Sequence, residues 1–128
     1  MRILVVDDVP VVSMVIAKAL HRAGHETTIA ANGDEALARL HEVRFDVLVT
    51  DIWMPGKDGM DLIRTSCAQW PSMGVVAMSG GDPHQTMDRS LDMALAAGAQ
   101  QVLMKPIDKD ELLAAVVAAA RTKGKVQL

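Results

Sequence analysis

The chain has 128 residues, of which 50% are hydrophobic, and this length and composition fit one domain with one core. Its net charge of -3 has the wrong sign for a surface that neutralises nucleic-acid phosphates, so direct nucleic-acid binding is not expected. Cys67 is the single cysteine, which excludes a disulfide framework and a Cys-rich zinc site and makes a reducing, cytoplasmic setting the default expectation. No apolar run has the length of a signal-peptide core or a membrane span, so no membrane association is expected.

Short β-branched runs alternate with helical patterns, which predicts five βα units around a parallel sheet. Pro10 suits the first turn of a helix after the first run, and Asn32 suits the cap of the next helix. The apolar residues of the first helix recur at helical spacing: Val12, Val15, Ile16, Ala19 and Leu20. The predicted strands are residues 2–7, 26–30, 45–50, 73–78 and 102–104.

Two further signals concern the second half of the chain. Residues 52–59 contain one Pro and two Gly, so they are predicted to form a loop before the third helix. Asp108 and Glu111 have the spacing of a capping box at the start of the last helix, which is predicted to end near Arg121.

Three of the predicted strands end in charged residues. Asp7 and Asp8 follow the first strand, Asp51 follows the third, and Lys105 follows the fifth. A single Asp at a strand end is usually a turn former or a helix cap. Because ligands in open α/β sheets bind outside the carboxyl ends of the strands, the four residues together predict one shared site.

The residue types indicate phosphate and metal chemistry. Three carboxylates in one cleft repel each other, which raises their proton affinity unless a cation is present. Mg²⁺ suits such a site because it prefers oxygen ligands. A carboxylate that attacks phosphorus becomes an acyl phosphate, to which Lys105 would offer a positive charge and Ser79 a hydroxyl donor.

These residues, in this order, resemble the receiver domain of two-component response regulators over essentially the whole chain. The motifs that carry the resemblance are Val5-Val6-Asp7-Asp8, Asp51 followed by Met54-Pro55 and Asp58-Gly59, Ser79, and Lys105-Pro106. The resemblance implies a doubly wound, flavodoxin-like (βα)5 fold of the α/β class, as in single-domain chemotaxis regulators. Residues 1–122 would form the receiver domain, and residues 123–128 a tail or the start of a linker.

The resemblance also implies roles for individual residues. Asp51 would be the phosphoacceptor. Ser79 would bond a phosphoryl oxygen and Lys105 would pair with the phosphoryl group, with a cis peptide bond between Lys105 and Pro106. The metal ligands would be Asp8, Asp51, the backbone carbonyl of Trp53 and, partly through water, Asp7.

Four positions depart from the common pattern of the family. Val102 stands where many receivers have a Tyr or Phe whose rotation accompanies activation, and Ile107 replaces a common Phe. Trp53 and Gly81 occupy positions that flank the path of water to the acyl phosphate in the family. The resemblance therefore implies that the bulk of Trp53 shields the acyl phosphate and gives it an unusual lifetime.

The predicted function is a phosphorylation-controlled switch in phosphorelay signal transduction. A histidine kinase or histidine phosphotransfer protein would donate a phosphoryl group to Asp51, and the modified state would bind a downstream output protein or output domain differently. The domain would promote its own phosphorylation and dephosphorylation without being an enzyme for an external substrate. One alternative is a receiver-fold interaction module whose output is independent of phosphorylation. Another is a Mg²⁺-dependent phosphatase, which is less favoured because a chain of one domain offers no second, capping domain to enclose a substrate and no evident substrate pocket.

The last helix carries an apolar arc that is wider than one contact with a sheet requires. The arc consists of Leu112, Leu113, Val116 and Val117. A partner-binding face is the favoured interpretation, because receivers commonly use the surface around their last two helices for output. A homodimer face and an Ala-rich helix of high propensity are the alternatives.

Overall fold

The computed structural model describes residues 1–52, 59–80 and 87–125. Within this part of the chain, five parallel strands form one sheet in the order β2-β1-β3-β4-β5, and each strand is followed by a helix. The strands are β1 (Arg2–Val6), β2 (Glu26–Ala30), β3 (Val47–Asp51), β4 (Gly74–Ser79) and β5 (Gln101–Met104). The helices are α1 (Pro10–Arg22), α2 (Gly33–Glu42), α3 (Gly59–Gln69), α4 (Met87–Ala97) and α5 (Lys109–Lys125). The predicted five-stranded α/β fold is confirmed.

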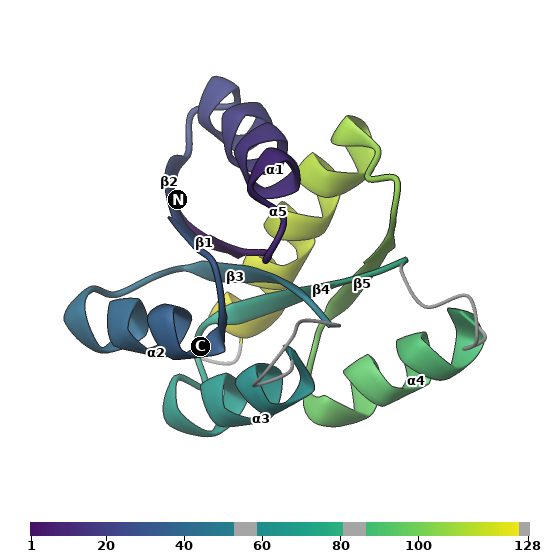
Figure 1. Cartoon of the computed structure of the whole chain (residues 1–128). Helices are drawn as coiled ribbons and strands as arrows, with labels where there is room; N and C mark the ends of the chain where they lie inside the picture. The colour runs from purple at the N-terminus through teal and green to yellow at the C-terminus, as the bar shows by residue number, and fades with distance from the viewer. Residues whose placement is uncertain (53–58, 81–86, 126–128) are drawn as a thin grey trace.

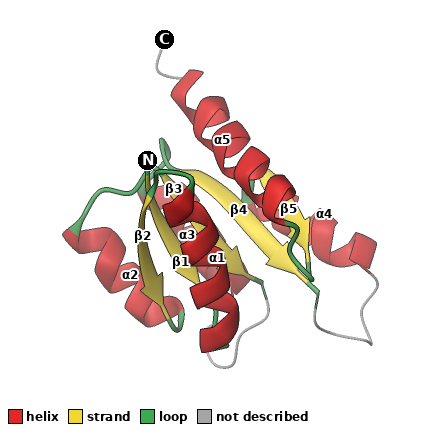
Figure 2. Ribbon diagram, turned by 90° about the horizontal axis from the view of Figure 1, so that it is seen from above, coloured by secondary structure: helices red, strands yellow, loops and turns green. Residues whose placement is uncertain are grey.

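The helices form a layer on each face of the sheet. Helices α1 and α5 cover one face, and α2, α3 and α4 cover the other (Figure 1). Seen from above, the arrowheads of the strands point toward the same end of the sheet (Figure 2). The carboxyl ends of the strands therefore share one edge, as a doubly wound sheet requires.

Strand β1 shows why the apolar runs are continuous rather than alternating. Ile3 and Val5 pack in the cluster that includes residues of α1 and α5, and Leu4 and Val6 pack in the cluster on the other face. All four side chains are buried, because β1 lies between β2 and β3 and helices cover both of its faces.

Two of the predicted caps are present. The Asn32 carbonyl oxygen Oδ1 accepts a hydrogen bond from the backbone N–H of Glu35 at 2.8 Å, which satisfies an amide at the start of α2. Asp108 Oδ2 accepts from the backbone N–H of Glu111 at 3.0 Å at the start of α5.

The last helix is longer than the sequence predicted, because α5 continues past Arg121 to Lys125. Its Ala-rich composition favours propagation, and the Thr122 hydroxyl donates to the carbonyl of Ala118 at 2.9 Å instead of interrupting the helix. Of the predicted apolar arc, Leu112 and Val116 are buried against the sheet, whereas Val117 is 36% exposed. None of the described helices is long and apolar enough to cross a bilayer.

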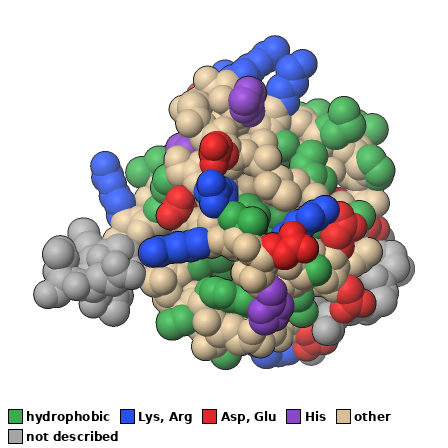
Figure 3. Space-filling view, turned by 90° about the vertical axis from the view of Figure 1, so that its left-hand side faces the viewer, with side chains coloured by type: hydrophobic (Ala, Val, Ile, Leu, Met, Phe, Trp, Pro, Cys, Tyr) green, Lys and Arg blue, Asp and Glu red, His purple; other side chains and the backbone are tan. Residues whose placement is uncertain are grey.

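Helix α1 differs from its predicted packing in one residue. Ile16 and Leu20 are buried as expected, but Val15 is 63% exposed. The helix carries more apolar residues than its sheet contact can cover, so some of them point to solvent. Figure 3 shows hydrophobic side chains at the surface in its upper right part.

Ser66 in α3 offers a test of the core, since its hydroxyl is the one buried side-chain polar atom without a hydrogen-bond partner among the described residues. We expect Ser66→Ala to raise the free energy of unfolding by about 1 kcal/mol, because the cost of burying the hydroxyl disappears. Ser13 is the matched control, since it is also buried in a helix but donates to the carbonyl of Pro10 at 3.1 Å. Urea denaturation of both variants measures the effect. Equal losses of stability in the alanine variants of Ser66 and Ser13 would contradict the idea that the Ser66 hydroxyl is buried at a cost.

Candidate metal and phosphoryl site

The sheet brings the predicted site residues to one edge. Strands β1 and β3 are neighbours with Val6 opposite Thr50, so Asp7 and Asp8 emerge beside Asp51, the last residue of β3. On the other side of β3, Ser79 ends β4 and is buried. Topology alone therefore places these residues together.

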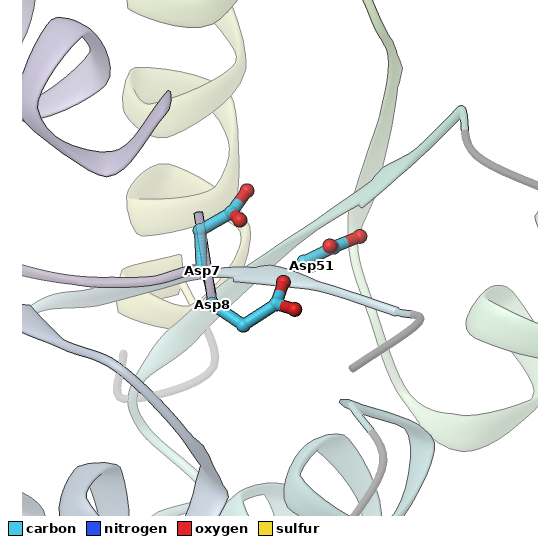
Figure 4. Close-up of side chains that lie close together, drawn as sticks. All are labelled: Asp7, Asp8 and Asp51. Carbon is cyan, nitrogen blue, oxygen red and sulfur yellow. The ribbon is translucent and has the colours of Figure 1, made fainter. Parts of the chain in front are cut away.

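The three carboxylates form a cluster. Asp7, Asp8 and Asp51 each offer an oxygen atom, and these atoms lie within 4.8 Å of one another (Figure 4). Asp7 is 1% and Asp51 6% exposed, whereas Asp8 is exposed to solvent. A set of oxygen ligands, two of them withdrawn from water, fits a small hard cation such as Mg²⁺.

Lys105 partly neutralises the cluster. Its ammonium nitrogen Nζ lies 2.9 Å from Asp7 Oδ2 and 3.2 Å from Asp51 Oδ2, so one cation bridges the ends of two strands. Burial by itself lowers the pKa of the Lys105 ammonium. The hydrogen bond to Asp7 and the negative charges of Asp51 and Asp7 outweigh this effect and raise the pKa above its ordinary value of 10.5.

Asp7 is fixed through both of its oxygens. Oδ2 accepts from Lys105, and Oδ1 accepts from the backbone N–H of Val9 at 2.9 Å. This second bond ties the carboxylate to the turn that leads into α1. Asp7 is therefore more constrained than the exposed Asp8.

The backbone around the site is also tied together. The backbone N–H of Lys105 donates to the carbonyl of Ser79 at 2.8 Å, and the Lys105–Pro106 peptide bond is cis, as the resemblance implied. The Thr50 hydroxyl donates to the backbone carbonyl of Asp51 at 3.0 Å. These bonds hold the main chain at the end of β3 and at Lys105.

Two glycines support the site in a way that the sequence did not reveal. A side chain at Gly59 would collide with the backbone carbonyl of Asp51, and a side chain at Gly80 would collide with the Cβ atom of Lys105. The only sequence signal was the presence of Gly59 in the Asp58-Gly59 motif. Because the obstructing atoms belong to distant segments, only the fold shows why glycine is needed there.

The remaining predicted positions have separate outcomes. Trp53 and Gly81 lie outside the described residues. Val102 is partly buried in β5 and packs against the cluster on the α2, α3 and α4 side, and Ile107 packs on the opposite side of the sheet. The two departures from the family thus contribute to the core on either side of the sheet.

A family model of the response regulator receiver domain matches residues 3–117. The chain belongs to this family. Receiver domains of two-component response regulators act in phosphorelay signalling with kinases and output domains, and they generally bind Mg²⁺ at an acidic pocket. The predicted family and its general function are therefore confirmed.

Curated relatives are longer than this receiver domain. It is 34% identical to the transcriptional regulatory protein TrcR of Mycobacterium tuberculosis, over 88% of this chain and 42% of TrcR. It is 38% identical to the DNA-binding transcriptional regulator NtrC of Salmonella typhimurium, over 88% of this chain and 23% of NtrC. The chain thus spans less than half the length of these two relatives.

Solved structures agree with the fold over nearly the whole chain. A response regulator receiver domain protein from Clostridium thermocellum superposes with a TM-score of 0.87 at 31% identity, covering 98% of each chain. NtrX from Brucella abortus, in complex with ADP, gives a TM-score of 0.89 at 31% identity, covering 98% of this chain and 28% of NtrX.

Replacing Lys105 tests the charge balance of the receiver site. Without metal at pH 7, we expect Lys105→Met to lower the free energy of unfolding by about 1–3 kcal/mol, because Asp7 and Asp51 lose their cation. The raised pKa means that this contribution is complete below pH 10.5, the ordinary pKa, and is lost as pH rises through the higher folded-state value.

Denaturation in EDTA between pH 7 and pH 12 measures this difference between wild type and variant. The difference should shrink above about pH 10.5. Lys109→Met serves as the control, since Lys109 is exposed and forms no ion pair within the described part of the chain. A difference in the free energy of unfolding that stays constant from pH 7 to pH 12 would contradict the stabilising role of the charged Lys105 ammonium.

Proposed function

We propose that Asp51 accepts a phosphoryl group from a histidine kinase or histidine phosphotransfer protein, and that the phosphorylated domain binds an output protein or output domain differently. One observation carries this proposal. Asp51 lies in an acidic cluster and is also 3.2 Å from the ammonium group of Lys105. A nucleophilic carboxylate beside a fixed cation suits transfer of a charged phosphoryl group.

The transfer step needs only Asp51 as its covalent partner. A carboxylate oxygen of Asp51 forms a bond to phosphorus while the bond between phosphorus and the donor nitrogen breaks. The electron pair of the broken bond stays on the imidazole of the donor histidine. The product is an acyl phosphate at the end of β3, and no external substrate is turned over. The same site would promote hydrolysis of the acyl phosphate.

Mg²⁺ is the proposed cofactor. Asp8 and Asp51 would hold it, with Asp7 acting partly through water and with the backbone carbonyl of Trp53, which lies outside the described residues. When bound, Mg²⁺ offsets the negative charge of the transferring group. The donor set of clustered carboxylates supports this choice.

Lys105 and Ser79 are the proposed source of the switch. Lys105 now pairs with Asp7 and Asp51, and a phosphoryl group on Asp51 would attract its ammonium more strongly than a carboxylate does. Ser79, buried at the end of β4, would donate its hydroxyl to a phosphoryl oxygen. Because these contacts exist in only one state, they can shift a conformational equilibrium.

Phosphorylation by a small acyl-phosphate donor with Mg²⁺ tests the acceptor residue. Intact mass should increase by one phosphoryl group in wild type and in the exposed control Asp110→Asn, and should not change in Asp51→Asn, because an amide is a poor nucleophile. A phosphoryl group on Asp51→Asn would contradict the assignment. Output-partner binding that is equal for phosphorylated wild type and Asp51→Asn would instead support the phosphorylation-independent module.

Thermal unfolding with and without Mg²⁺ tests the metal site. Mg²⁺ at 100 times its dissociation constant should stabilise wild type by about 2.7 kcal/mol, because it binds only the folded state. We expect Asp8→Asn to lose most of this stabilisation and Asp110→Asn to keep it. Full stabilisation of Asp8→Asn would remove Asp8 from the ligand set.

A further inference from the structure

A hollow lies at the edge of the sheet opposite the acidic cluster. Strands β3 and β4 are neighbours with Val47 opposite Gly74, so the segments that enter them from α2 and α3 run side by side. These two segments and the last turn of α2 enclose a volume of about 330 Å³. Helices α2 and α3 are in contact and cover the same face of the sheet (Figure 1). We call the space at their carboxyl ends the amino-edge hollow.

The floor of the amino-edge hollow is apolar. Leu40, Phe45 and Met73 line it, and all three are buried members of the core cluster on the α2, α3 and α4 side of the sheet. A ligand that covers this floor exchanges contact with water for contact with apolar side chains. Such a floor with a few polar groups around it is the usual composition of a small-molecule site.

Trp70 forms a wall of the hollow. Its ring lies edge to face with that of His41, with 5.0 Å between the ring centroids and 68° between the planes. Its backbone N–H donates to the carbonyl of Ser66 at 2.8 Å, and its carbonyl accepts from the N–H of Met73 at 3.0 Å. Trp70 is therefore held in place while part of it stays exposed, which suits contact with a flat aromatic ring.

The charge that the lining offers to a ligand is positive. Arg44 is exposed and forms no ion pair within the described part of the chain. Glu42, the carboxylate among the lining residues, is already paired, because its Oε2 lies 3.2 Å from Nη1 of Arg39. A guanidinium group binds a carboxylate through two parallel hydrogen bonds. The lining therefore suits an anionic group of this kind.

The carboxylates of an adjoining hollow also have partners other than Arg44. That hollow, of about 460 Å³, shares Arg44 with the first and is lined by Arg2, Glu26 and Asp46 as well. Asp46 Oδ2 accepts from the backbone N–H of Arg2 at 2.8 Å, and Glu26 Oε2 lies 3.1 Å from Nε of Arg2. The Arg44 guanidinium is therefore left for a ligand.

The size of the amino-edge hollow limits its occupant. A volume of about 330 Å³ is at the lower end of the range of small-molecule cavities and can take one or two fused rings. A partner helix, which is about 10 Å across with its side chains, does not fit into it. Size, apolar floor and unpaired guanidinium thus agree on one class of ligand.

We propose that the amino-edge hollow binds a small aromatic carboxylate. Its rings would lie on the apolar floor against Trp70, and its carboxylate would pair with Arg44. The inference is independent of the proposed function, because the hollow shares no residue with the acidic cluster and Lys105.

Nuclear magnetic resonance of the isotope-labelled protein tests the site, with 2-naphthoate as the probe. The indole N–H signal of Trp70 and the backbone signals of residues 40–45 should shift and saturate. Two further probes separate the contributions. The uncharged analogue 2-naphthamide should bind about tenfold more weakly, because it cannot pair with a guanidinium. Hexanoate, a flexible aliphatic acid, should also bind more weakly, since it has no ring to place against Trp70.

Variants of Arg44 assign the charge contact. Arg44→Gln should raise the dissociation constant of 2-naphthoate about tenfold and leave that of 2-naphthamide unchanged. Arg44→Lys should have an intermediate effect, because it keeps the charge but not the paired donors. Arg121→Gln is the matched control, since Arg121 is exposed on α5 and also forms no ion pair among the described residues. It should bind 2-naphthoate like wild type.

The aromatic contact has its own pair of variants. Trp70→Leu should weaken the binding of 2-naphthoate and 2-naphthamide by the same factor, and Trp70→Phe should restore much of it, because a ring is again present. His41→Ala supplies a second measurement if Trp70→Leu does not fold, since His41 is exposed. It should weaken both probes, because Trp70 loses the ring contact that holds it.

Several results would overturn the inference. Equal affinity of wild type and Arg44→Gln for 2-naphthoate, or no shift at millimolar 2-naphthoate, would remove the site. Equal affinity for hexanoate and 2-naphthoate would remove the aromatic class. Shifts of the same signals on raising the protein concentration alone would assign the hollow to a second copy. Binding of a peptide with an aromatic residue beside an Asp, without binding of 2-naphthoate, would assign it to a protein partner.

Discussion

The bridge from Lys105 to Asp7 and Asp51 is the interaction on which the architecture of the site depends. Three carboxylates at one sheet edge repel one another, and two of them are almost removed from water. Lys105, after β5, spans the edge to reach the ends of β1 and β3. The folded chain thus holds an acidic cluster whose charge Lys105 compensates in part, which leaves negative charge for a further cation.

The parallel sheet is the reason why such distant residues meet. Asp7 and Lys105 are 98 positions apart, yet both follow strands that end at the same edge. Shifting β1 by a single residue would move its side chains to the opposite face of the sheet, so the register that places Ile3 and Val5 on one face and Leu4 and Val6 on the other also fixes the direction of the charged residues that follow. Packing and chemistry are specified by the same short segments.

Much of the fold and of the site could be predicted from the sequence, because strands covered on both faces are continuous apolar runs and the residues after them are easily recognised. The sheet, the convergence of Asp7, Asp8, Asp51 and Lys105, and the caps at Asn32 and Asp108 followed from local signals. The length of α5 did not, since no residue marks its end sharply. The exposure of Val15 and the lack of space for a side chain at Gly59 depend on contacts with other segments of the folded chain, and no local sequence pattern reports such contacts.

The contact at Gly59 has a mechanical consequence. The first residue of α3 lies so close to the Asp51 carbonyl that not even a methyl group fits between them, and its own N–H is bonded to the carbonyl of Ile52 at 2.9 Å. The end of β3 and the start of α3 therefore act as one rigid joint. A backbone displacement of Asp51 toward α3 would therefore push on Gly59 and move the start of the helix with it.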